Sequence, residues 1–127
     1  MEAHSAADVR AWSLISGAGR VAIGLAMLAA PEPALGALGF SEVSPATAAV
    51  GRIAGIRDLV LGAVTLAALD DPDRLRIATL ANAAADAGDT TAFAIALGAG
   101  ERSAGARGLA TALPATLLGL WAAWRLS

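Results

Sequence analysis

The sequence predicts an all-α protein, a four-helix transmembrane bundle formed by one membrane domain that comprises residues 1–127. Hydrophobic residues make up 57% of the chain and its mean hydropathy is +0.63, whereas soluble domains contain roughly 45 to 50% apolar residues. Four segments of about 20 residues or more, separated by turns rich in proline, aspartate and glycine, are each long enough to cross a bilayer core of about 30 Å. Charged residues make up only 16% of the chain, too few for the polar outer face of soluble amphipathic helices.

The first helix is expected at about residues 8–30. It stops at the sequence PEP, because Pro31 has no backbone N–H and biases the residue before it away from helical geometry. The acidic, polar opening MEAHSAADVR differs from the basic start of a signal peptide, so this helix is expected to be retained. In the connector that follows, Leu35, Leu38 and Phe40 are typical of a loop or short helix at the membrane interface.

The next two helices have clear start signals. A Ser or Asp side chain can accept a hydrogen bond from a free N–H of the first turn, and proline fits the first helical position because no N–H is needed there. These signals occur together at Ser44-Pro45 and at Asp71-Pro72. We therefore expect the second helix at about residues 45–69 and the third at about residues 72–97. The fourth spans about residues 104–126, where Pro114 predicts a kink rather than a break.

Arginines near the ends of the four helices and in the turns between them predict the orientation in the membrane. More of them lie on the side of the two termini and of the turn after the second helix than on the opposite side. The first group is Arg10, Arg74, Arg76 and Arg125, and the second is Arg102 and Arg107. By the positive-inside rule, both termini are expected to be cytoplasmic, in a bacterial cell membrane.

Helical spacing places small residues along one face of each of the first two helices. Such faces let another backbone approach closely, either within the chain or in a homo-oligomer formed through the Gly-rich faces. The two stripes are Gly17, Arg20 and Gly24 in the first helix, and Gly51, Gly55, Asp58 and Gly62 in the second. Because Arg20 lies on such a stripe, we expect its side chain to point into the bundle.

Ionisable residues interrupt the first three apolar segments. Charges at such depth are costly and usually face a bundle interior. The expected buried set comprises the basic residues Arg20, Arg52 and Arg57 and the acidic residues Asp58, Asp86 and Asp89. Since a guanidinium group can donate two parallel hydrogen bonds to a carboxylate, we expect at least two Arg to Asp contacts between helices.

Three segments resemble a family of short bacterial and fungal four-helix integral membrane proteins that is classed as a domain of unknown function and is distantly DoxX-like. They are GAGRVAIGLAMLAAPEPALGALGF, GRIAGIRDLVLGAV and ADAGDTTAFA. The similarity lies at Arg20, at the Arg57-Asp58 pair followed by Gly62, and at the cluster of Asp86, Asp89 and Thr90. The resemblance implies the fold and an integral-membrane location, and it brings no established reaction.

The leading functional prediction is that the bundle binds a small lipophilic molecule, and whether it also transforms that molecule is left open. Apolar walls would hold its body, and polar groups would fix its polar end. The predicted ligand-binding residues are Arg20, Arg57, Asp58, Asn82, Asp86, Asp89 and Thr90. If a reaction occurs, Asp86 and Asp89 are the candidate catalytic residues, because repulsion between carboxylates one turn apart favours one of them holding a proton. Whether the protein is an enzyme stays open.

Two alternatives remain. In the first, the protein is a structural or accessory membrane subunit in which the buried charges do no more than pair with each other. In the second, it is a small proton or solute transporter that acts as an oligomer, and the charges line the transport path.

Other classes fit the sequence poorly. A net charge of -2 gives no basic surface for nucleic acid, and the absence of cysteine excludes thiol chemistry. Membrane lipid is the expected surrounding partner. Asn82, Asp86 and Asp89 offer oxygen ligands on one helix face, but no second acidic motif accompanies them and arginines can neutralise them. We therefore expect no metal and no other cofactor.

Overall fold

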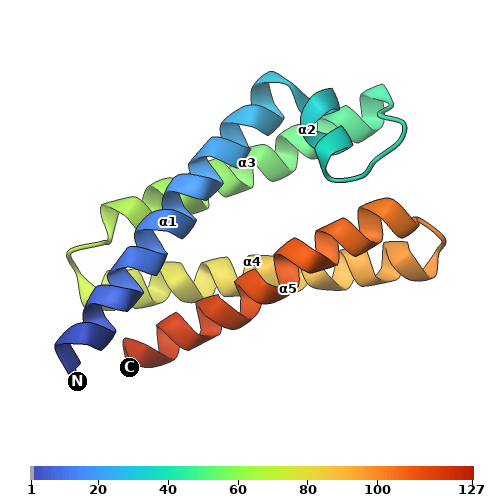
Figure 1. Cartoon of the computed structure of the whole chain (residues 1–127). Coiled ribbons are helices and arrows are strands. Elements are labelled where there is room, and N and C mark those ends of the chain that lie inside the picture. Colours follow the sequence, from blue (N-terminus) through green and yellow to red (C-terminus); the bar gives the residue numbers. More distant parts are fainter. Residues whose placement is uncertain (1) are drawn as a thin grey trace.

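The computed structural model describes residues 2–127, with side chains from Ala6 onward, and within that range the chain is entirely helical apart from its turns (Figure 1). The helices are α1 (Glu2–Ala29), α2 (Pro31–Ala37), α3 (Pro45–Ala67), α4 (Pro72–Gly98) and α5 (Arg102–Arg125). The all-α prediction is confirmed. The four long helices correspond to the four expected ones, and α2 is a short helix within the connector.

The local signals act as the sequence predicts. The Ser44 side chain accepts a hydrogen bond from the Thr47 N–H at 3.1 Å, and the Asp71 carboxylate accepts one from the Arg74 N–H at 3.1 Å. In both helices proline is the first residue. Helix α5 continues through Pro114 without a break. The main difference lies at the start of α1, which begins several residues earlier than expected.

The helices form two layers (Figure 1). In one layer α1 packs along α3, with α2 at one end; in the other, α4 packs along α5. Contacts between the layers are far fewer than contacts within them. Both termini and the turn between α3 and α4 lie at one end of the molecule, and α2 and the turn between α4 and α5 lie at the other (Figure 1).

The glycine stripes of α1 and α3 face each other. A Cβ atom built on Gly24 would lie 2.6 Å from the Gly55 carbonyl oxygen, and one on Gly62 would lie 2.6 Å from the Gly17 carbonyl oxygen. Such distances leave no room for a side chain, so the two backbones touch. A homo-oligomer formed through these stripes would therefore have to displace a contact that the chain makes with itself.

Small residues and several polar side chains fill much of the interior. The buried residues are mostly alanine and glycine, and they include the polar side chains of Ser13, Arg20, Thr65, Thr79, Asn82 and Asp86. Many large aliphatic residues are exposed instead. Those that lie on the outer surface, each more than half exposed, are Leu25, Ile53, Ile56, Val60, Val64, Ile77, Ile95 and Leu117. The molecule thus has an apolar outer surface around a small-residue, partly polar interior.

By length and apolar composition, one helical segment in the described part of the chain qualifies as a candidate membrane span, Ala6–Ala29 in α1. The longest run without a charged residue lies at residues 108–124 in α5. That segment does not qualify, and an arginine flanks it at either end, Arg107 and Arg125. In α3 and α4 the ionisable residues interrupt the apolar stretch.

Candidate functional site

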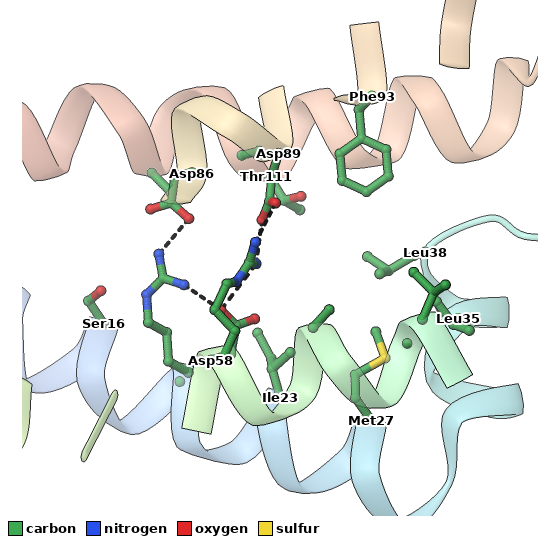
Figure 2. Close-up of a pocket in the computed structure, with 18 of the residues that line it drawn as sticks. Ser16, Ile23, Met27, Leu35, Leu38, Asp58, Asp86, Asp89, Phe93 and Thr111 are labelled. Carbon is green, nitrogen blue, oxygen red and sulfur yellow. Dashed lines mark hydrogen bonds and ion pairs between the residues drawn. The ribbon is translucent and has the colours of Figure 1, made fainter. Parts of the chain in front are cut away.

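Arg20 connects three helices in the middle of the bundle. From α1, its Nη1 atom donates a hydrogen bond to Oδ1 of Asp58 in α3 at 2.6 Å, and its Nη2 atom donates to Oδ1 of Asp86 in α4 at 2.5 Å (Figure 2). Nη2 also lies 3.4 Å from the backbone oxygen of Asn82. Only 10% of the Arg20 side chain is exposed. The predicted inward position of Arg20 is therefore confirmed.

A second arginine extends this network. Arg57 in α3 donates two parallel hydrogen bonds, both 2.7 Å long, to the two carboxylate oxygens of Asp89 in α4, and it also lies 3.3 Å from Oδ1 of Asp58. The exposed fractions are 37% for the Arg57 side chain and 31% for Asp89. This pair thus forms the more open side of the cluster, and the prediction of at least two interhelical Arg to Asp contacts is confirmed.

Arg52, expected among the buried charges, is exposed, so this expectation was wrong. Arg52 is the residue after Gly51, and successive residues of an α-helix are about 100° apart around the axis. Its side chain therefore lies beside the glycine stripe and not on it. Its Nε atom donates to the backbone oxygen of Leu28 at 3.4 Å, in the last turn of α1. The long side chain therefore interacts with a carbonyl at a helix end, where cations are favoured.

The cluster borders a cavity of about 460 Å³ between the two layers. Five of the seven predicted ligand-binding residues line it: Arg20, Arg57, Asp58, Asp86 and Asp89. Apolar side chains form the wall toward α2, as Figure 2 shows: Ile23, Met27, Leu35, Leu38 and Phe93. Trp12 and Ile15 line it on the other side of the charged cluster, so the cavity has mostly apolar walls with one charged cluster among them.

The remaining two predicted residues, Asn82 and Thr90, do not line this cavity. Asn82 donates from Nδ2 to the Thr65 hydroxyl at 2.8 Å, and that hydroxyl donates to the Leu61 carbonyl oxygen at 2.8 Å. Thr90 donates to the Asp86 carbonyl oxygen at 2.7 Å and lies 3.4 Å from the Thr116 hydroxyl in α5. Both residues thus join neighbouring helices beside the cluster.

The sequence did not assign the connector to the site. Leu35, Leu38 and Phe40 were expected at a membrane interface, but all three line the cavity. Leu35 also packs on Gly51, where a Cβ atom would lie 2.9 Å from a Leu35 methyl carbon. The only signal in the sequence was three large apolar side chains within six residues, and it did not show against which helix the segment packs.

The charged side chains that line the cavity are better suited to hydrogen bonding than to metal binding. In the part of the chain that the structure describes, no group of three His, Cys, Asp or Glu side chains could hold a metal ion. The carboxylates near the cavity are already paired with guanidinium groups.

No family model, curated protein or solved structure matches the chain. The resemblance to a DoxX-like membrane family therefore stays a prediction from the sequence.

Proposed function

We propose that this protein is an integral membrane protein that binds a small lipophilic molecule with a polar end. The observation that carries the proposal is the cavity of about 460 Å³, which has mostly apolar walls and five charged side chains in its lining. Pockets for small molecules have volumes of about 300 to 1,000 Å³ and combine apolar walls with a few polar groups. The body of the ligand would lie toward Phe93 and Leu38, and its polar end would approach Arg57 and Asp89.

The outer surface supports the membrane location. Large aliphatic side chains such as Ile53, Val60 and Leu117 are more than half exposed, and a lipid surrounding would cover them. The four long helices contain 28, 23, 27 and 24 residues, which corresponds to roughly 34 to 42 Å at about 1.5 Å per residue. All four are thus long enough to cross a bilayer core of about 30 Å.

The position of the charges supports the same location. Arg20, Asp58 and Asp86 lie well inside their helices and are mostly buried. A charge on the lipid side would be costly, whereas a paired charge facing the bundle interior is tolerated. The ionisable residues that weaken the apolar pattern of α3 and α4 therefore agree with membrane insertion of these helices.

Filling the cavity tests the binding role. A Cβ atom on Gly19, which lines the cavity, meets no atom within 4 Å, and the same holds for Gly88, which does not line it. Gly19→Leu is expected to fold normally and to weaken binding of 1-naphthylmethanol to the purified full chain in neutral detergent micelles. Gly88→Leu, the matched control, is expected to bind like the wild type. Equal binding by the two variants would contradict the proposed site.

A structural role is the second candidate, and one observation favours it. Each of the five charged side chains in the cluster has at least one partner of opposite charge. Such a network joins α1, α3 and α4 without any ligand. If the cluster has only this structural role, neither the wild type nor Gly19→Leu would bind naphthyl compounds more strongly than protein-free micelles do.

A further inference from the structure

We infer that the ligand of the cavity is a lipophilic cation, such as an aryl or alkyl amine that is protonated at neutral pH. This inference rests on the proposed binding function and narrows its ligand class. The cluster contains two guanidinium groups, of Arg20 and Arg57, and three carboxylates, of Asp58, Asp86 and Asp89. With all three carboxylates ionised, one negative charge is left without compensation, and a cation in the cavity would allow Asp86 and Asp89 to be ionised together.

The unused hydrogen-bonding atoms at the cavity agree with this charge. Asp58 and Asp86 each accept hydrogen bonds through Oδ1, and within the described residues Oδ2 of neither has a partner. These two Oδ2 atoms are not among the fully buried atoms without partners, whereas the Nε atoms of Arg20 and Arg57 are. All four Nη atoms already donate to aspartates. A ligand entering the cavity thus meets unused carboxylate oxygens and arginines that are already engaged.

Electrostatics inside the cavity favour a cation over other head groups. The effective dielectric constant there is far below that of water, so an uncompensated charge interacts strongly with whatever enters. An ammonium group would neutralise the cluster, while a carboxylate or phosphate would add a second unpaired negative charge. A neutral head group would leave the cluster as it is.

Aromatic side chains add to this preference. Trp12, Phe40 and Phe93 line the cavity, and the face of an aromatic ring attracts a cation that lies within about 6 Å of its centre. The same rings provide apolar surface for the body of the ligand. The cavity thus combines a negative end with walls suited to an aryl or alkyl group.

Three probes of similar shape and different charge test the inference. They are 1-naphthylmethylamine, a cation at neutral pH; 1-naphthylmethanol, which is neutral; and 1-naphthoate, an anion. Their binding to the full chain in neutral detergent micelles is measured by calorimetry, with protein-free micelles as the blank. The amine is expected to bind about tenfold tighter than the alcohol or more, and the anion most weakly. Equal binding of amine and alcohol, or preference for the anion, would overturn this inference alone, whereas no binding of any probe would overturn the proposed function with it.

Variants that change the charge of the cluster should change the preference for the amine over the alcohol in a defined direction. A cluster with only a structural role would not produce this pattern. Asp89→Asn and Asp86→Asn each neutralise the extra charge, so the preference for the amine over the alcohol should fall about tenfold. Arg57→Gln leaves two uncompensated negative charges and should increase that preference. Asp73→Asn, which changes an exposed aspartate outside the cavity, is the control for total charge. Thermal unfolding identifies the variants that fold. For those variants, the affinity for the amine is divided by the affinity for the alcohol, and the ratios are compared. If that ratio falls in Arg57→Gln as it does in the aspartate variants, charge selection is wrong.

Discussion

Gly24 in α1 and Gly55 in α3 meet backbone to backbone. A Cβ atom on Gly24 would lie 2.6 Å from the Gly55 carbonyl oxygen, and one on Gly55 would lie 2.9 Å from the Gly24 carbonyl oxygen. Real Cβ atoms do not approach other atoms so closely, and the obstructing atoms belong to backbone that cannot turn aside. The distance between α1 and α3 is therefore set by the absence of side chains at these two positions.

Adding a single methyl group should separate these helices. Gly24→Ala and Gly55→Ala are each expected to lower the free energy of unfolding by about 1 to 3 kcal/mol, the usual cost of overpacking. This loss should appear although alanine favours a helix over glycine by about 1 kcal/mol. Gly88→Ala is the control, because a Cβ atom there meets no atom within 4 Å. Circular dichroism during heating in detergent measures the difference, and Gly24→Ala unfolding at or above the Gly88→Ala temperature would disprove the close contact.

Arg20 should contribute more to stability than any exposed arginine of the same helix. Arg20→Met leaves the mostly buried carboxylates of Asp58 and Asp86 without their main partner, and such a loss costs about 3 to 5 kcal/mol. Arg10→Met is the control on the same helix. Arg10 pairs with Asp70 at 3.0 Å, but the two side chains are 55% and 90% exposed, and pairs of this kind contribute about 0 to 1 kcal/mol.

The measurement is again the unfolding of the purified variants in detergent. Arg20→Met is expected to unfold at a clearly lower temperature than Arg10→Met and to give a lower yield. Equal unfolding temperatures would mean that water reaches the Arg20 cluster and that its ion pairs contribute little to stability.

Local signals in the sequence were sufficient for the helices and for most of the ionic cluster. Ser44 and Asp71 cap their helices as predicted, because capping depends on a few adjacent residues. Because charges in an apolar interior need partners of opposite sign, the sequence predicted that arginines such as Arg20 and Arg57 pair with aspartates on other helices. Arg52 differs because it lies beside the small-residue stripe, where a long side chain can reach a helix end instead.

The cavity could not be predicted in the same way. Its volume depends on the separation of the two layers and on the return of α2 over α3, and neither follows from the spacing of residues within one helix. Leu35 shows the difficulty: its packing on Gly51 is a contact between segments 16 positions apart. The sequence predicted small residues along the face of α3 that carries Gly51, but not which partner would cover that position.

The membrane orientation that follows from the proposed location can be tested with single cysteines, because the chain contains none. Asp73 lies at the start of α4 and Glu101 precedes α5 at the opposite end of the molecule (Figure 1). Because Arg52 is exposed in the half of α3 nearer α2, the excess of arginine at the end with the termini is smaller than the sequence count suggested. It still favours cytoplasmic termini.

In intact bacterial cells, a membrane-impermeant maleimide is therefore expected to label Glu101→Cys and not Asp73→Cys. After the cells are opened with detergent, both variants should react equally, which controls for accessibility. Labelling of Asp73→Cys alone in intact cells would reverse the orientation. Release of the protein from membranes by alkaline carbonate would contradict the membrane location itself.

Phe93 links the packing of the second layer to the cavity. Its ring lies against Gly108 of α5, without room for a Cβ atom there, and it also lines the cavity. Gly108→Ala should push the ring toward the cavity and weaken binding of 1-naphthylmethylamine by about tenfold, a usual effect of one misplaced methylene-sized group in an apolar pocket. Phe93→Ala in the same chain removes the obstructing ring, so the double variant should bind more tightly than Gly108→Ala alone.

Gly105→Ala separates this effect from a general loss of stability. Gly105 packs against Leu97, where a Cβ atom would lie 2.7 Å from the Leu97 Cβ atom, and neither residue lines the cavity. This variant should lower the unfolding temperature as Gly108→Ala does and leave the affinity for the amine unchanged, because the strain that it introduces lies at the end of the α4 and α5 pair. If both glycine variants reduced the affinity equally, Phe93 would have no specific part in shaping the site.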